Sequence, residues 1–474
     1  MTNLVHKVNF SNPRSFSTTV KSDLKETFFP DDPFRQFKNE PSTFHKATKT
    51  IQYFLPVFEW LPKYNFKLFR YDILAGITIA CLAVPKGISY AKLANLPPIL
   101  GLYSSFIPPL IYAIFGSSKD IAVGTIASAS VLLASIIDQA VSAKDNPTLY
   151  VHLVFTATFF TGVFQFALGF FRLGILVDFL SHSTIIGFMS GAATIICLQQ
   201  LKGMFGLVHF TSKTDIISVL SSVFSQTHHW RWQSALAGVC FLVFLLATKE
   251  VKKKKPSLYW VSALAPMLTV VIGCLVAYFG HADKHGIQIV GPLKKGINPS
   301  SIQFLNFDPE YLPYTIKAGI MTGFLALAEG IAIARSFAMM KNNQIDGNKE
   351  MVAFGMMNLV GSFTSCYLTT GPFSKTGVNY SAGCKTAMSN AVMAVCMMLT
   401  LLFIAPAFSY TPLVTLSAII MAAMLGLIEY EEAYHIYKVD KYDIRKLGSN
   451  FSQYGCRPHD IHRIIHHQST YMRC

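Results

Sequence analysis

Charged side chains are scarce in this chain. Asp, Glu, Lys and Arg make up only 14% of its 474 residues, whereas 52% of the residues are hydrophobic. Soluble globular domains carry about 25% charged residues, so the composition excludes an ordinary water-soluble fold. The mean hydropathy of +0.40 instead indicates an all-α polytopic membrane protein.

Signatures of covalent and metal chemistry are lacking as well. The nine cysteines are scattered, mostly in apolar segments, and no two have the C-x-x-C spacing, so we expect packing residues. The four tail histidines, His459, His462, His466 and His467, have only Cys456 as a nearby thiol, and we expect a solvated, disordered tail rather than a zinc site. No cluster of nucleophile, base and orienting residue emerges, and no cofactor fingerprint is present. The sequence therefore predicts a protein that is not an enzyme and has no metal or cofactor.

Long apolar runs dominate the middle of the chain. Residues 1–70 have no signal-peptide core and read as a cytosolic N-terminal leader. We expect a transmembrane domain over 71–432, and a linker with an atypical basic tail over 433–474. About eleven runs approach the roughly 17 to 25 residues that span a bilayer. They begin near Ile73, Pro98, Ile121, Tyr150, Ser183, Ser234, Tyr259, Tyr314, Met351, Thr386 and Pro412.

The basic residues that give the net charge of +15 lie between these runs and at the two ends of the chain, not on one compact face. We therefore expect no binding of nucleic acid. Lys252 to Lys255 form the densest short basic loop. The positive-inside rule predicts that this loop is cytosolic. Counting spans back from it places the N-terminus on the cytosolic side too.

Two short apolar stretches are interrupted by glycine and small polar residues. They are Ile121 to Ile137 (IAVGTIASASVLLASII) and Gly371 to Asn390 (GPFSKTGVNYSAGCKTAMSN). A broken helix is tolerated in a membrane only where it faces protein or a watery cavity, and such pairs mark the substrate site of secondary transporters. The free N–H groups and positive dipole at a half-helix N-terminus suit an anion.

Three ionisable residues, Lys86, Glu329 and Lys375, lie inside apolar segments. A charge at the bilayer centre costs about 2.5 to 3.5 kcal/mol on insertion scales, so each is a functional candidate. A carboxyl group at Glu329 can take up and release a proton, as a proton-coupled carrier requires. Ser374 and Lys375 stand before the second half-helix, where a hydroxyl and a cation suit an oxyanion. The alternatives are structural: pairing of Glu329 with a lysine or Arg335, and lysines that snorkel to the interface.

Three long motifs resemble the SulP family of anion transporters, and most closely its plant sulfate transporters. They are YDILAGITIACLAVPKGISYAKLANLPPILGLYSSFIPPLIYAIFGSSKDIAVGT from Tyr71, FLALAEGIAIARSFA from Phe324, and GPFSKTGVNYSAGCKTAMSN from Gly371. The leader PRSF…LKETFFPDDPFRQF is also similar to the plant members. The resemblance runs from about residue 5 to about residue 443.

The resemblance implies an inverted-repeat (7+7) transporter fold, in which a core of spans 1 to 4 and 8 to 11 moves against a gate. The gate that the resemblance implies consists of spans 5 to 7 and 12 to 14. No spanning run follows Asp443, so we expect an incomplete gate of spans 5 to 7, and we expect the STAS domain of the family to be absent. Carried over by motif, the substrate-binding residues are Lys86, Tyr90, Ala127, Ser128, Ser374 and Lys375, and Glu329 is the proton-coupling acid.

Two of these positions differ from the family pattern. Lys86 stands where the family usually has glutamine, and Lys375 where many relatives have arginine. Lysine keeps the charge of arginine but lacks its planar fork. A second cation at position 86 is expected to slow release of the anion or to change which anion is preferred.

Two hypotheses of function follow. The first is a secondary active carrier of sulfate or a related tetrahedral oxyanion, working by proton symport and alternating access, with protons and the lipid bilayer as its other partners and a homodimer as a possible assembly. The second is a truncated, transport-inactive product that acts at most as an interaction partner of full-length relatives. Both are integral multi-pass proteins of the plasma membrane or of an internal membrane such as that of the plastid or the endoplasmic reticulum. Phosphate, selenate and molybdate share the tetrahedral chemistry of sulfate, so the sequence leaves the anion open.

Overall fold

The computed structural model describes residues 51–52, 55–173, 182–207, 220–221, 223–255, 258–279, 288–291, 293, 295–340 and 345–426. Within these ranges the regular structure is helical, apart from two isolated β-bridges. The predicted all-α membrane architecture is confirmed. Most of the predicted leader, and all of the predicted tail at 433–474, lie outside the described residues.

The described helices are α4 (Val57–Trp60), α5 (Phe66–Leu93), α6 (Pro98–Tyr103), α7 (Ile107–Phe115), α8 (Ala127–Ile137), α9 (Pro147–Phe170), α11 (His182–Phe205), α13 (Trp232–Lys254), α14 (Tyr259–Phe279), α15 (Leu312–Met340), α16 (Gly347–Phe363), α17 (Phe373–Ser381), α18 (Met388–Leu399) and α19 (Leu413–Leu425). Short turns of 3-10 helix are η1 (Leu61–Lys63), η2 (Thr227–His229), η4 (Ile302–Phe304) and η6 (Ala405–Tyr410), and η5 (Thr400–Ile404) is a π-helical turn.

Each of the eleven expected spans corresponds to a helical segment. Among the described residues, seven segments are long and apolar enough to cross a bilayer, and the apolar helices α8 and α19 are shorter. Helices α11 and α16, with 24 and 17 residues, account for the other two. The first span starts earlier than predicted, because Asn65 caps α5: its side-chain oxygen accepts a hydrogen bond from the N–H of Leu68 at 3.0 Å.

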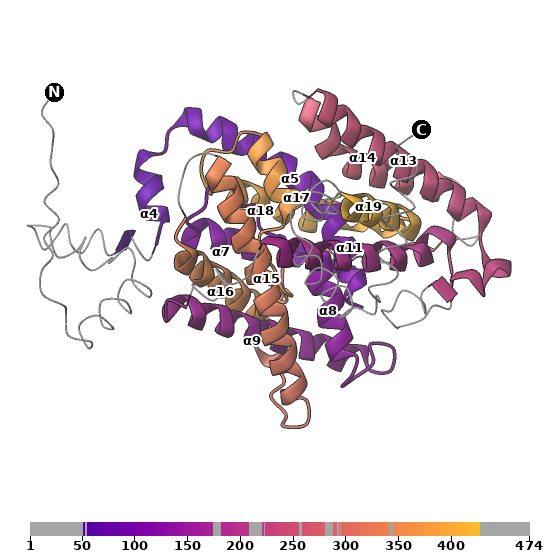
Figure 1. The fold of residues 1–474 in the computed structure, drawn as a ribbon, viewed down its shortest axis with the longest axis horizontal. Coiled ribbons are helices and arrows are strands. Elements are labelled where there is room, and N and C mark those ends of the chain that lie inside the picture. The colour runs from indigo at the N-terminus through magenta and orange to yellow at the C-terminus, as the bar shows by residue number, and fades with distance from the viewer. Residues whose placement is uncertain are drawn as a thin grey trace, which may run out of the picture.

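Packing divides the helices into two groups. In the first group α9, α15 and α16 pack on one another, and α5 packs on α6 and α18. In the second group α11, α13, α14 and α19 pack together, and Figure 1 shows this group to the right of the first. The expected gate spans 5 to 7 are α11, α13 and α14, and α19 joins them by its contacts with α11 and α13. Helix α5 also contacts α14 and α19, so it lies where the two groups meet.

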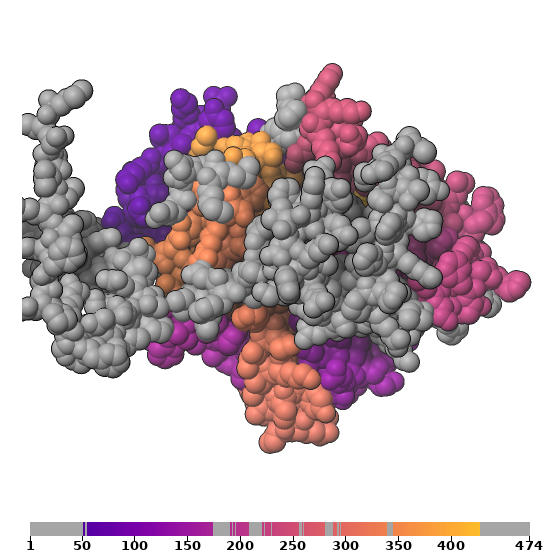
Figure 2. Space-filling view, viewed as in Figure 1, coloured from indigo at the N-terminus to yellow at the C-terminus, as the bar shows by residue number. Residues whose placement is uncertain are grey.

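The outer faces of α13 and α14 are apolar. Trp232, Val239 and Val243 of α13 and Leu268 and Leu275 of α14 are all exposed. Parts of these two helices are visible in pink at the upper right of the space-filling view (Figure 2). A solvent-facing helix carries polar residues on its outer face, so this surface is suited to the hydrocarbon of a bilayer.

Candidate functional site

Both interrupted stretches break as the sequence predicts, but Ser374 and Lys375 lie in the first turn of the second half-helix rather than before it. In the first, α8 starts only at Ala127, after extended residues that include Ile126. In the second, α17 starts at Phe373, after Pro372 in an extended conformation. The two extended segments cross: the N–H of Gly124 donates to the carbonyl of Thr370 at 2.8 Å, and the N–H of Thr370 donates back at 2.9 Å. This antiparallel bridge satisfies backbone groups that lie outside any helix.

Side chains satisfy more of the first extended segment. The Asn390 side-chain oxygen accepts from the N–H of Val123 at 2.9 Å, and its amide donates to the carbonyl of Ile121 at 2.7 Å. The Thr376 hydroxyl accepts from the N–H of Ala122 at 3.3 Å. Residues around the second break therefore hold the first break in place.

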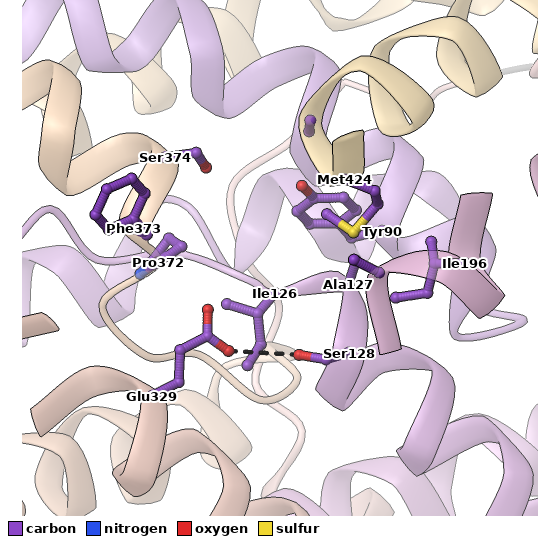
Figure 3. A pocket seen from close by; sticks show the side chains of 12 residues that line it. Tyr90, Ile126, Ala127, Ser128, Ile196, Glu329, Pro372, Phe373, Ser374 and Met424 are labelled. Atoms are coloured by element: carbon purple, nitrogen blue, oxygen red, sulfur yellow. Dashed lines mark hydrogen bonds between the residues drawn. The ribbon is translucent and has the colours of Figure 1, made fainter. Parts of the chain in front are cut away.

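A pocket opens where the two half-helices begin (Figure 3). The cavity is narrow, with a volume of about 30 Å³. Five of the seven residues predicted for the site line it: Tyr90, Ala127, Ser128, Glu329 and Ser374. They come from α5, α8, α15 and α17, so the fold brings together residues that are far apart in the sequence.

The N-termini of α8 and α17 both meet this pocket without a side-chain cap. Ile126 and Pro372 occupy the cap positions, and neither makes a capping hydrogen bond. The first N–H groups of an α-helix have no partner within the helix. Two uncapped N-termini at one pocket therefore offer backbone donors and two positive dipole ends to an anion.

Glu329 lies on α15 at the floor of the pocket in Figure 3, opposite α8. It is only 7% exposed. The Ser128 hydroxyl donates to its carboxylate at 3.4 Å, and Tyr90 lies within electrostatic range of it. An ionisable group inside a membrane-spanning helix is a functional candidate, and this one borders the pocket beside Ser128.

Lys375 is not among the residues that line the pocket. Its side chain is fully buried and points at the crossing of the two extended segments, where a Cβ on Gly124 would overlap its Nζ. This Nζ has no hydrogen-bond partner among the described residues. Lys375 follows Ser374 in the chain, but its side chain does not line the pocket.

Lys86 also lies outside the pocket lining. It follows Pro85 within α5, is 5% exposed, and lies within electrostatic range of Lys249 and Lys375. The structure therefore brings Lys86 and Lys375 near each other but places neither against the pocket. Their predicted contact with substrate stays a prediction.

Two buried carboxylates fix the ends of the broken segments. Glu350 of α16 accepts hydrogen bonds from the N–H groups of Ser117 and Ser118 at 3.0 and 2.7 Å, and from the hydroxyls of Ser117 and Tyr112 at 2.5 and 2.7 Å. Asp72 of α5 accepts from the N–H groups of Lys385 and Thr386 at 2.7 and 3.2 Å. These acids hold the turns that precede the first break and follow α17.

Sequence reasoning missed the apolar part of the lining. Ala193 and Ile196 of α11, and Ala423 and Met424 of α19, complete the pocket from the second group of helices. They lie inside long apolar runs and carry no signal that separates them from packing residues. The described residues contain no group of three or more His, Cys, Asp or Glu side chains that could hold a metal ion.

Comparison with known proteins agrees with the geometry. The Sulfate permease family matches residues 69–446. "Probable sulfate transporter 3.5" of Arabidopsis thaliana is 66% identical over 444 residues, which are 94% of this chain and 70% of that protein. "Sulfate transporter 3.1" of the same plant is 61% identical over 92% of this chain and 66% of its own length.

Solved structures share the fold. The structure of SLC26A9 superposes with a TM-score of 0.80 at 25% identity, covering 89% of this chain and 68% of that one. The transmembrane domain of the cyanobacterial bicarbonate transporter BicA superposes with a TM-score of 0.72 at 19% identity, over 83% of this chain and 96% of that domain. The family match extends over most of the transmembrane helices described above, and the chain therefore belongs to the sulfate permease family.

Proposed function

We propose that this protein is a proton-coupled carrier of sulfate or a closely related tetrahedral oxyanion. The observation that carries the proposal is the pair of uncapped half-helix N-termini, α8 and α17, at one pocket with Ser128 and Ser374. Backbone N–H groups and hydroxyls bind oxyanions by donating hydrogen bonds. The names of the plant relatives favour sulfate among the oxyanions.

The buried Lys375 supports an anionic substrate. A buried ammonium group without a partner is unfavourable. A dianion bound between the N-termini of α8 and α17 compensates the positive charge of Lys375, which lies on the other side of the crossing segments. In this proposal Lys375 acts through its field from behind the site, while N–H groups and hydroxyls make the contacts. The role is that of a positioning and charge-balancing residue.

Glu329 supplies the proton coupling. Its carboxyl group borders the same pocket, so its negative charge and that of the oxyanion repel each other when both are present. Protonation of Glu329 removes this repulsion and favours binding of the anion. Release of the proton on the other side of the membrane then favours release of the anion.

Alternating access uses the two groups of helices. The pocket lies between residues of the first group, such as Tyr90 and Ser374, and residues of the second, such as Ile196 and Met424. Sliding of one group against the other changes the side from which the pocket is reached. Transporters with repeats commonly move in this way around a fixed site.

The test is uptake of radiolabelled sulfate by yeast that lacks its own sulfate transport. We expect saturable uptake by this chain that increases as the external pH is lowered, and loss of most uptake in the double variant S128A/S374A. Sulfate binding by the purified chain without any uptake contradicts the carrier and favours an interaction partner of longer relatives. Saturable uptake that is independent of external pH contradicts the proton coupling alone.

A further inference from the structure

Three helices that line the pocket lead to lysines at one end of the bundle. Lys92 lies two residues beyond the pocket residue Tyr90 on α5, and Lys202 lies six residues beyond Ile196 on α11. Helix α8 has 11 residues, which is about 16 Å, and runs from the pocket at Ala127 toward the loop that carries Lys144. All three lysines are exposed.

Hydrogen bonds fasten two sides of this end together. The Asn95 side chain donates to the carboxylate of Asp138 at 3.0 Å, and the Tyr150 hydroxyl donates to the carbonyl of Ala94 at 2.9 Å. The end of α5, the loop after α8 and the start of α9 therefore form one rim. Lys92 and Lys144 lie on it, and Lys202 lies near them at the end of α11, in the second group of helices.

The lysines are neighbours of one another. Lys202 lies within electrostatic range of both Lys92 and Lys144. Two carboxylates, Asp138 and Asp145, also lie here. Asp138 accepts the hydrogen bond from Asn95 and interacts with Lys144. The charges that act on Lys92 and Lys202 are those of other lysines, so positive charge gathers near the ends of α5 and α11.

This end is opposite the predicted cytosolic loop. The N–H of Arg231 donates to the carbonyl of Phe205 at 3.1 Å, so the end of α11 meets the start of α13. Lys252 to Lys254 lie at the other end of α13. The positive-inside rule predicts few lysines at the non-cytosolic face, so three neighbouring lysines there need another reason.

We propose that Lys92, Lys144 and Lys202 form an anion-collecting rim, a peripheral site for divalent oxyanions at the non-cytosolic mouth of the pathway. This inference rests on the proposed carriage of an oxyanion. A cluster of charges of one sign raises the local concentration of counter-ions and their rate of association. The effect grows with the charge of the ion, so the rim favours sulfate over chloride before either reaches the pocket.

The test is equilibrium binding of radiolabelled sulfate to the purified chain in phosphatidylcholine nanodiscs, at about 20 and about 150 mM ionic strength. Screening is weak at the first and strong at the second. We expect the variant K92Q/K144Q/K202Q to bind sulfate about three- to tenfold more weakly at low ionic strength. The difference is expected to shrink at high ionic strength.

Matched variants separate the rim from general charge effects. K92R/K144R/K202R keeps the charges and is expected to bind as the unaltered chain does. K253Q removes an exposed lysine at the opposite end and is expected to leave the Kd unchanged. An unchanged Kd in the glutamine triple variant, or an equal loss in K253Q, overturns the rim alone. Absence of sulfate binding by the unaltered chain contradicts the proposed function, and the rim with it.

Discussion

Glu329 is a carboxyl group buried beside the pocket, with Ser128 as its hydrogen-bond partner. If its protonation couples proton and anion movement, Glu329→Gln mimics the protonated state permanently. We expect this variant to keep sulfate binding and exchange but to lose uptake driven by an inward proton gradient. Uptake at external pH 5 and pH 7.5, compared with exchange of internal for external sulfate, measures the difference. Glu310→Gln, at an exposed position, is the control, and acid-stimulated uptake that persists in Glu329→Gln rules out the coupling role.

The position of the Lys375 ammonium group depends on Gly124, a glycine in the other half of the site. A Cβ at position 124 overlaps its Nζ, so Gly124→Ala is expected to displace the ammonium group from the crossing. Removing the charge by Lys375→Ala is expected to cost about 1.5 to 3 kcal/mol, the scale of a nearby unit charge acting on a dianion at an effective dielectric constant of about 20, or roughly ten- to a hundredfold in sulfate affinity. Both variants should raise the Kd measured by sulfate binding, while Lys317→Ala, an exposed lysine of α15, leaves it unchanged. Unaltered affinity in Lys375→Ala would falsify the role of its charge.

Lys86 is a cation in the range of two others, Lys249 and Lys375. Its replacement by glutamine removes like-charge repulsion and gives the residue that the family resemblance leads us to expect there. We therefore expect Lys86→Gln to transport sulfate at an equal or faster maximal rate. The maximal rate and KM of uptake are the measurements. Loss of sulfate binding in this variant shows instead that Lys86 is a ligand adapted to this chain.

At the scale of elements, α16 holds the segment that leads into α8. Glu350 is fully buried and receives four hydrogen bonds from Tyr112, Ser117 and Ser118. Glu350→Gln turns one acceptor oxygen into a donor that faces other donors, which is expected to destabilise the protein by about 2 to 4 kcal/mol. The melting temperature in detergent should fall, and KM for sulfate should rise more than in a variant destabilised elsewhere.

Two comparisons make the Glu350 prediction decisive. Glu59→Gln changes an exposed acid of α4 and should alter neither quantity. Glu350→Asp keeps the acceptors and is expected to recover part of the stability and of the KM. A melting temperature in Glu350→Gln equal to that of the unaltered chain contradicts an anchoring role.

The broken elements could be predicted from sequence because glycine and small polar residues interrupt apolar runs at both places. The orientation of Lys375 could not be predicted, since it depends on the approach of Gly124, which lies far away in the chain. The contributions of α11 and α19 were also hidden. Ala193, Ile196, Ala423 and Met424 are apolar residues in apolar helices, and only the packing of the two groups shows that they meet the pocket.

At the scale of the whole molecule, the pocket lies at the boundary between the two groups of helices. Among its lining residues, Ala127 belongs to α8, which packs mainly on α15 of the first group, and Ile196 belongs to α11 of the second. Movement of one group against the other must change the separation of these positions, whereas contacts inside the first group stay fixed. Thr161 and Thr322 provide such a fixed contact, since their hydroxyls lie 3.3 Å apart between α9 and α15.

Cross-linking therefore separates sliding groups from a static pore. In a variant without its native cysteines, a short bifunctional thiol reagent applied to A127C/I196C is expected to reduce sulfate uptake at least tenfold. Cleavage of the linker by reductant should restore uptake, because only the relative movement is blocked. The same treatment of T161C/T322C should leave uptake largely intact, since it joins helices of one group. Full uptake after complete cross-linking of A127C/I196C, with linkage verified by mass spectrometry, excludes alternating access by movement at this boundary.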